Sequence, residues 1–251
     1  MGHGYRNWVV FFRKLSGDLL DFIYPPFCGT CGLPLKDEEK NICRNCWQTL
    51  TTIKAPFCQR CGLPLDSAGL LCPVCRVRQR RFSFARSLGP FDERFQKVIH
   101  LLKYRHRKSL AEPLARMLAS SLRQERRFDA MEAILPVPLH AVKARSRGYN
   151  QSELIAAHLA RRTGLRLLKG TLRRTRNTPS QSGLGLARRE INVRGAFGVK
   201  DRQTISGKRL ILVDDVLTTG ATVDACVEVL LQAGAEEVCV LTVARTLEPG
   251  L

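Results

Sequence analysis

Apolar and polar positions in the C-terminal part of the chain follow a pattern that predicts both helices and strands. Phe95, Val98, Ile99 and Leu102 recur on one face of a helix, whereas short apolar runs are typical of buried strands. The predicted strands cover 133–137, 166–172, 208–213 and 237–244, and further helices cover 110–122, 150–163 and 222–232. Apolar strands that alternate with helices indicate a parallel sheet covered on both faces, which is an α/β fold.

Two segments between these elements are expected to be loops that contact a ligand. Residues 138–149 follow the strand at 133–137, and Asn150 with Glu153 resembles a capping box that starts the next helix. Residues 175–192 are polar, basic and glycine-containing, and they predict a long mobile loop.

The first residues predict a separate amphipathic helix. Apolar residues between Trp8 and Tyr24 approximate helical spacing, and Pro25-Pro26 ends the pattern. We expect this helix to pack on the rest of the protein, and a helix on a membrane surface is the alternative. Together with the cysteine-rich segment described next, the expected domains cover 1–26, 27–78 and 79–251.

Eight of the ten cysteines form four CxxC pairs within an internal repeat, in which 27–35 reappears as 57–65. This spacing is typical of zinc ligands rather than of disulfides. The repeat favours sequential pairing into two structural zinc sites, although cross-braced pairing stays open. The first set is Cys28, Cys31, Cys43 and Cys46, and the second is Cys58, Cys61, Cys72 and Cys75. Cys226 and Cys239 lie outside the pattern, and we expect them to be buried.

Charge and hydropathy narrow the range of partners and compartments. The 251 residues include 41 Lys and Arg against 22 Asp and Glu, which gives a net charge of +19 and favours polyanionic partners such as nucleic acid or phosphorylated ligands. No apolar stretch approaches the ~20 residues that span a bilayer, and the start lacks the pattern of a signal peptide. The sequence therefore predicts a soluble, cytoplasmic protein.

A phosphate-binding loop is predicted where the apolar strand ending at Val213 meets two carboxylates and then a helix. The strand places Asp214 and Asp215 at the carboxyl edge of the sheet, where ligands of α/β proteins bind. Gly220 permits a tight turn, and the helix that follows directs its positive end toward a phosphate. The remaining loop residues are Val216, Leu217, Thr218, Thr219, Ala221 and Thr222.

This loop resembles the signature of type I phosphoribosyltransferases. The resemblance implies that Asp214 and Asp215 hold the ribose hydroxyls of 5-phosphoribosyl-1-pyrophosphate (PRPP), directly or through Mg²⁺, and that 217–222 cradle the 5-phosphate. Thr218 stands where the 6-oxopurine branch has an aspartate that serves the base, which argues against hypoxanthine or guanine as the acceptor.

Two basic sets fit the same site. Lys143, Arg145 and Arg147 resemble the loop that neutralises pyrophosphate, and Arg188 lies in the segment that resembles a hood closing over the substrate. A solvated basic face is the alternative explanation for both sets.

The order of segments along the whole chain resembles the ComF family, a competence-associated group of phosphoribosyltransferase-like proteins. The cysteine ribbons are followed by Leu102-Lys103-Tyr104, then by the segment from Pro138 to Gln151, and finally by the Asp-Asp loop. The resemblance implies a role in natural transformation, in which single-stranded DNA is taken up and handled beside a DNA-translocating ATPase and recombination mediators.

Three functions stay open at this point. The protein is a phosphoribosyltransferase that displaces pyrophosphate from PRPP, or a nucleic-acid-handling protein that uses the fold to sense a nucleotide, or a scaffold that docks partner proteins through its ribbons. The sequence does not decide the accepting base or whether the chain is an enzyme.

Overall fold

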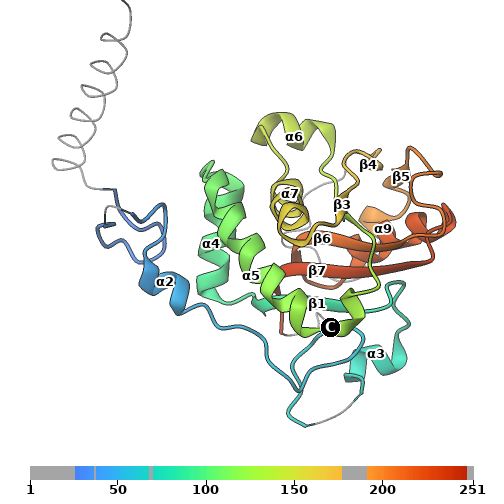
Figure 1. Ribbon diagram of the computed structural model, residues 1–251, viewed down its shortest axis with the longest axis horizontal. Coiled ribbons are helices and arrows are strands. Elements are labelled where there is room, and N and C mark those ends of the chain that lie inside the picture. The colour runs from blue at the N-terminus through green and yellow to red at the C-terminus, as the bar shows by residue number, and fades with distance from the viewer. Residues whose placement is uncertain (1–25, 37, 68–69, 177–190, 248–251) are drawn as a thin grey trace, which may run out of the picture. The chain divides into compact units, whose positions relative to one another are not determined.

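The computed structural model describes residues 26–36, 38–67, 70–176 and 191–247 (Figure 1). The predicted N-terminal helix and most of the predicted loop at 175–192, including Arg188, lie outside the described residues. The chain divides into two compact units, Met1–Leu50 and Thr51–Leu251. The boundary separates the two cysteine sets, and the second set belongs to the larger unit.

A five-stranded parallel sheet forms the centre of the larger unit and confirms the predicted α/β class. Its strand order is β1-β7-β6-β2-β3, and every neighbouring pair is parallel. The strands are β1 Ala85–Pro90, β7 Glu237–Arg245, β6 Arg209–Leu217, β2 Ala133–Pro136 and β3 Arg166–Leu167. Strands β4 Leu172–Arg174 and β5 Phe197–Val199 form a separate antiparallel pair.

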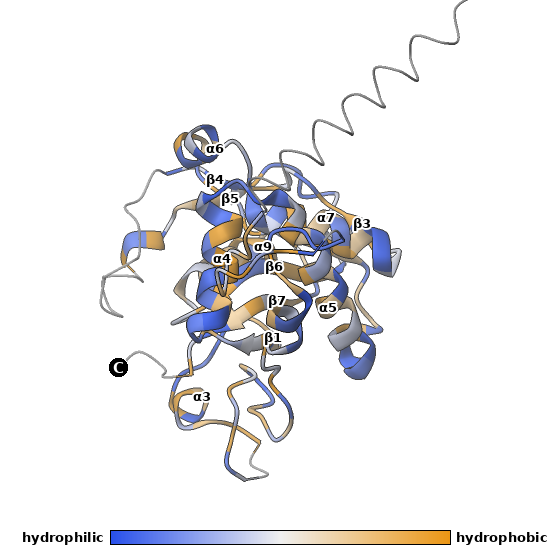
Figure 2. Ribbon diagram, turned by 90° about the vertical axis from the view of Figure 1, so that its left-hand side faces the viewer, coloured by the Kyte–Doolittle hydropathy of each residue, from blue (hydrophilic) through white to orange (hydrophobic). Residues whose placement is uncertain are grey.

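Helices cover the sheet on both faces. On one face, Leu210 and Leu212 of β6 share a hydrophobic core with Val223 and Val227 of α9, and side chains alternate along a strand, so Ile211 and Val213 point to the opposite face. The helices are α4 Glu93–Tyr104, α5 Ala111–Gln124, α7 Gln151–Thr163 and α9 Ala221–Gln232. Hydrophobic residues are concentrated in β6, β7 and α9 (Figure 2).

Amphipathic spacing correctly predicted the buried face of α4. Its buried residues are Phe95, Val98, Ile99 and Leu102, and its first turn is capped by Asp92, whose side chain accepts a hydrogen bond from the Phe95 amide. Asn150 likewise caps α7, but its side chain accepts from the Ser152 amide. The side chain of Glu153 pairs with Lys169 at 2.8 Å, outside the predicted capping box.

Three predicted boundaries were wrong. The expected loop at 138–149 contains a short helix, α6 Ala141–Arg147, which His140 caps and Gly148 ends with φ of 75°. The expected strand at 166–172 is divided into β3 and β4 by a turn at Gly170, whose φ is 76°. The strand predicted to end at Val213 continues to Leu217, because β7 pairs with it as far as Arg245.

Within the described ranges, 3₁₀ turns precede and follow α5, and short helices lie in the cysteine segments. These elements are η1 Lys108–Leu110, η2 Arg126–Phe128, α2 Arg44–Gln48 and α3 Pro73–Val77. Across the described residues, no helix combines the length and the apolar character that crossing a membrane requires.

Candidate functional site

Asp214 and Asp215 lie at the carboxyl edge of the sheet, beyond the end of the neighbouring strand β2. Strand β2 ends at Pro136, opposite Val213, so Asp214 and Asp215 continue β6 beyond its neighbour. From β2 the chain proceeds outward to β3, and from β6 it proceeds in the other direction to β7. This change of direction is the switch point at which α/β sheets bind ligands beyond the carboxyl ends of their strands.

Asp215 is held by a lysine and a glutamine from two helices. The residue is only 5% exposed, and its carboxylate accepts hydrogen bonds from Lys103 Nζ at 2.9 Å and from Gln151 Nε2 at 2.6 Å. Burial lowers the pKa of Lys103, but the charge and hydrogen bond of Asp215, together with the charge of Asp214, outweigh burial and raise this pKa. The ion pair therefore keeps Lys103 charged beneath the site.

A chain of hydrogen bonds links Asp215 to the basic helix α6. Arg147 Nη1 donates to Gln151 Oε1 at 2.6 Å, while the Nε2 atom of Gln151 bonds Asp215. The geometry of the carboxylate thus depends on a residue of the segment that was expected to receive pyrophosphate.

Asp214 is less well compensated than its neighbour. Its carboxylate accepts hydrogen bonds from Ser152 Oγ and from the Asp215 amide, both at 2.9 Å. Burial, and then the negative charge of Asp215, raise the pKa of Asp214 to about 7. A cation or a hydroxyl donor placed beside this carboxyl group would stabilise its charged form, as Mg²⁺ or ribose hydroxyls do.

The raised pKa predicts a stability that depends on pH. A carboxyl group that binds its proton more tightly in the folded state stabilises the fold below its unfolded pKa near 3.8, and this contribution is lost as pH rises through about 7. Asp214→Asn removes the ionisation, so its stability relative to wild type is expected to rise between pH 5 and 7 by at most about 1.4 kcal/mol per pH unit. Urea unfolding at several pH values measures this difference, and parallel curves for the two proteins would contradict it.

A turn at the carboxyl edge of the sheet connects β6 to α9. Gly220 has φ of 83°, which favours glycine, and a Cβ there would lie 2.7 Å from Arg80 Nη1 and displace this guanidinium from the turn. Helix α9 begins at the next residue, and Thr219 Oγ1 accepts a hydrogen bond from the Ala221 amide at 3.4 Å. The strand, the glycine turn and the helix N-terminus together form an arrangement suited to a phosphate.

Arg80 braces this turn from the segment that follows the second cysteine set. Its Nη1 atom donates to the Thr219 carbonyl at 2.7 Å and pairs with Asp224 at 3.0 Å. The Arg81 amide donates to the other oxygen of Asp224 at 3.1 Å.

Sequence reasoning assigned no site role to Lys103, Gln151, Ser152 or Arg80. Lys103 and Gln151 lie in segments on which the family resemblance rests, and this was the only feature of the sequence that pointed to them. No feature of the sequence pointed to Ser152 or Arg80, because their hydrogen-bond partners are distant in the sequence.

The predicted basic residues of α6 have different surroundings. Lys143 is half-buried, and burial followed by the charges of Arg174 and Arg147 lowers its pKa, whereas Arg145 is exposed. Three cations therefore gather between α6 and β4, an arrangement that attracts an anion.

The cysteines group sequentially, as the repeat favoured. In each set of four the Sγ atoms lie within 4.8 Å of one another. Pairs such as Cys28–Cys46 and Cys61–Cys72 have Sγ atoms 3.8 and 3.7 Å apart, and tetrahedral Zn²⁺ with Zn–S bonds of about 2.3 Å requires about 3.8 Å. Both sets fit structural zinc. Cys226 and Cys239 are buried in α9 and β7, as expected.

The second cysteine set belongs to the core of the larger unit. All four of its cysteines are buried, and Cys61 and Leu63 share one hydrophobic core with Leu217 and Val223 beside the phosphate turn. In the first copy of the repeat, the residue equivalent to Leu63 is Leu33, which is 63% exposed. The two copies therefore have the same ligands but different surroundings.

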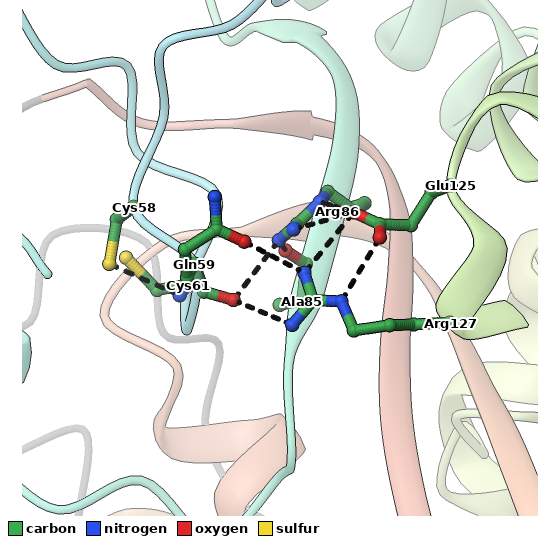
Figure 3. Close-up of polar contacts among 7 residues, drawn as sticks. All are labelled: Cys58, Gln59, Cys61, Ala85, Arg86, Glu125 and Arg127. Carbon is green, nitrogen blue, oxygen red and sulfur yellow. Dashed lines mark hydrogen bonds and ion pairs between the residues drawn. The ribbon is translucent and has the colours of Figure 1, made fainter. Parts of the chain in front are cut away.

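Arginines attach the second ribbon to the sheet (Figure 3). The Ala85 amide of β1 donates to the Arg60 carbonyl at 2.7 Å. Arg86 and Arg127 both donate to the Gln59 carbonyl and both pair with Glu125. Arg245 donates to the Cys61 carbonyl, so its positive charge would lie close to the net negative charge of four thiolates bound to one zinc ion.

Comparison with known proteins identifies both parts of the chain. Residues 19–76 match the model of the double zinc ribbon domain, and residues 108–249 match that of the phosphoribosyl transferase domain. The chain is 31% identical over 226 residues to DNA utilization protein YhgH of Escherichia coli K12, covering 89% of this chain and 98% of that protein. It is 30% identical over 178 residues to Competence protein F of Haemophilus influenzae, covering 69% of this chain and 78% of that protein.

Among solved structures, the chain is similar to a glutamine PRPP amidotransferase from B. subtilis, with 26% identity and a TM-score of 0.36 over 53% of this chain. The match spans about a quarter of that protein, 26% of its length. A hypoxanthine phosphoribosyltransferase from Staphylococcus aureus matches with 15% identity and a TM-score of 0.32, over 54% of this chain and 62% of that one.

The family matches and the observed fold define a phosphoribosyl transferase domain joined to a double zinc ribbon. With relatives that are named for DNA utilization and competence, the chain belongs to the ComF family.

Proposed function

We propose that this protein binds PRPP together with Mg²⁺ at the carboxyl end of β6 and uses this site in handling single-stranded DNA during natural transformation. The observation that carries the proposal is the continuous arrangement of Asp214, Asp215, the Gly220 turn and the start of α9 at the switch point of the sheet. The two carboxylates suit ribose hydroxyls or a divalent cation, and the turn with the helix N-terminus suits a phosphate.

Each part of the ligand has residues of matching chemistry. The carboxylates of Asp214 and Asp215 would hold the ribose hydroxyls or Mg²⁺, and 217–222 would surround the 5-phosphate. Lys143, Arg145 and Arg147, with Arg188 from outside the described residues, would face the pyrophosphate. Bound Mg²⁺ would neutralise negative charge on the pyrophosphate.

The chain's own residues would do the positioning that such chemistry requires. Lys103 and Gln151 fix the orientation of the Asp215 carboxylate. Arg80 fixes the carbonyl of Thr219 and thereby holds the conformation of the turn. If an acceptor displaces pyrophosphate, the protein is a phosphoribosyltransferase. If none does, the same site senses a nucleotide, which is the second candidate.

The DNA part of the proposal rests on charge and on relatives. A net charge of +19 favours polyanions, and relatives are named for DNA utilization and competence. We place the protein in the cytoplasm, where it would meet incoming single strands beside a DNA-translocating ATPase and a recombination mediator.

Calorimetry with zinc-loaded protein tests the ligand. PRPP with Mg²⁺ is expected to bind, and ribose 5-phosphate is expected to bind at least tenfold more weakly, because it lacks the pyrophosphate that two or more cations contact. Lys143→Ala should weaken PRPP binding and leave ribose 5-phosphate binding unchanged. The absence of PRPP binding by the wild type would refute the proposal, and equal losses for both ligands would refute the role of Lys143.

A further inference from the structure

The segment that follows α4 is exposed and cationic, and the proposed PRPP site does not use it. All six residues from Tyr104 to Ser109 are exposed. Arg105, His106, Arg107 and Lys108 follow Tyr104 directly, and helix α6 lies at the same end of the larger unit, the upper end in Figure 1. We refer to residues 104–109 as the Tyr104 segment.

Contacts with Tyr149 hold the Tyr104 segment in place. Lys108 Nζ lies 5.0 Å from the centroid of the Tyr149 ring, and the His106 ring lies 5.9 Å from it. The Tyr149 hydroxyl donates a hydrogen bond to the carbonyl of Leu102 in the last turn of α4. The segment is therefore folded onto the α6–α7 junction, and the backbone amides of Arg105 and Arg107 both donate to the Leu101 carbonyl of α4.

Tyr104 presents an aromatic ring to solvent at this place. It is 57% exposed, and among the described residues of the larger unit no other Phe, Tyr or Trp is exposed to that extent. The guanidinium carbon of Arg147 lies 4.9 Å from its ring centroid, and the His100 ring lies 5.0 Å away at 43°. These two neighbours hold the ring in position, while more than half of the residue's surface is exposed to solvent.

A ring held in this way within a cluster of cations matches the chemistry of one ligand class. Bases of a single strand stack on aromatic rings, and its phosphates attract arginine and lysine. A duplex offers its phosphates but keeps its base faces stacked inside, so the ring would add nothing to duplex binding.

We propose that the Tyr104 segment is a binding site for single-stranded nucleic acid, in which a base stacks on Tyr104 while Arg105 and Arg107 contact phosphates. This inference rests on the DNA part of the proposed function and assigns it to particular residues. The site adjoins the PRPP site through two links: Lys103 pairs with Asp215, and Arg147 reaches Asp215 through Gln151.

Fluorescence anisotropy with the full zinc-loaded chain tests the stacking. The probes are a labelled oligothymidine and an oligonucleotide of equal length with abasic sites in place of the bases. Tyr104→Ala should weaken oligothymidine binding about tenfold, as the loss of one stacked base does, and leave the abasic probe unaffected. Tyr104→Trp should retain binding of oligothymidine, which separates loss of the ring from loss of structure.

The charges are tested by the dependence on salt. Arg105→Gln with Arg107→Gln should reduce the log–log salt slope by about 1.4 on both probes, or about 0.7 for each phosphate contact. The matched control is Arg116→Gln with Arg123→Gln, which removes two exposed arginines of α5 and should leave the slope unchanged.

The outcomes separate this inference from the function on which it rests. If the wild type binds neither probe, the DNA part of the proposed function fails, and the inference fails with it. If the wild type binds oligothymidine and Tyr104→Ala binds it equally well, the inference is overturned while the proposed function stands. If Tyr104→Ala lowers only the binding of a free nucleobase in the presence of PRPP, the ring serves an acceptor base, and the inference is likewise overturned.

Discussion

Replacing Cys61 and Cys72 with serine is expected to destabilise the whole larger unit, whereas the same change at Cys31 and Cys43 should leave that unit folded. Structural zinc contributes on the order of 10–16 kcal/mol to small zinc domains, and a typical domain is stable by about 5–15 kcal/mol in total. The second set shares its hydrophobic core with Leu217, so its loss removes packing beneath the phosphate turn.

The two pairs of substitutions are matched, because the repeat places them at equivalent ligand positions. Each variant is expected to lose one zinc ion, which metal analysis measures. Circular dichroism and thermal unfolding should then show a lowered transition only for Cys61→Ser with Cys72→Ser. Equal unfolding temperatures for the two variants would mean that the stability of the larger unit does not depend on the second cysteine set.

The double substitution Asp214→Asn with Asp215→Asn is expected to weaken PRPP and Mg²⁺ binding by about 100-fold or more. Each charge-assisted hydrogen bond contributes about 1.5–3 kcal/mol, and about 1.4 kcal/mol corresponds to a tenfold change. The amide side chains keep the shape of the carboxylates but lose the negative charge that Mg²⁺ requires. Calorimetry of the folded, zinc-loaded variant measures the effect.

The two single substitutions are expected to differ in their effect on the stability of the protein. Asp215→Asn removes the charge partner of Lys103, which is 2.9 Å away, and should lower stability by about 1–3 kcal/mol. Asp214→Asn removes a poorly compensated buried charge and should not lower stability at neutral pH. The control is Asp201→Asn, which changes an exposed carboxylate bonded to Thr204. Full PRPP binding by the double variant would place the ligand elsewhere.

Local patterns in the sequence predicted the parts of the site that lie close together in the chain. Asp214, Gly220 and the start of α9 fall within a few residues of one another, so strand, turn and helix N-terminus could be derived from their order. The grouping of each cysteine set was predicted for the same reason, since a repeat brings its own four ligands together.

The boundaries of helices and strands were predicted less well where the local sequence pattern does not decide them. Residues 138–149 were predicted to be a loop after the strand at 133–137, but a His140 cap and the Gly148 turn suffice for the seven residues of α6. Pairing with β7 extends β6 through both aspartates, although acidic residues disfavour strands.

By itself, the sequence determined the α/β class, the two zinc-type cysteine sets and the acid–turn–helix order of the phosphate loop, because each depends on neighbouring residues or on a regular period. Only the tertiary structure decided that Lys103 and Gln151 hold Asp215, that Arg80 braces the Gly220 turn, and that the second ribbon shares the core of the larger unit. The hydrogen bonds among these contacts join residues 64 to 139 positions apart. Such contacts arise only when folding places whole elements against one another, and no local propensity encodes them.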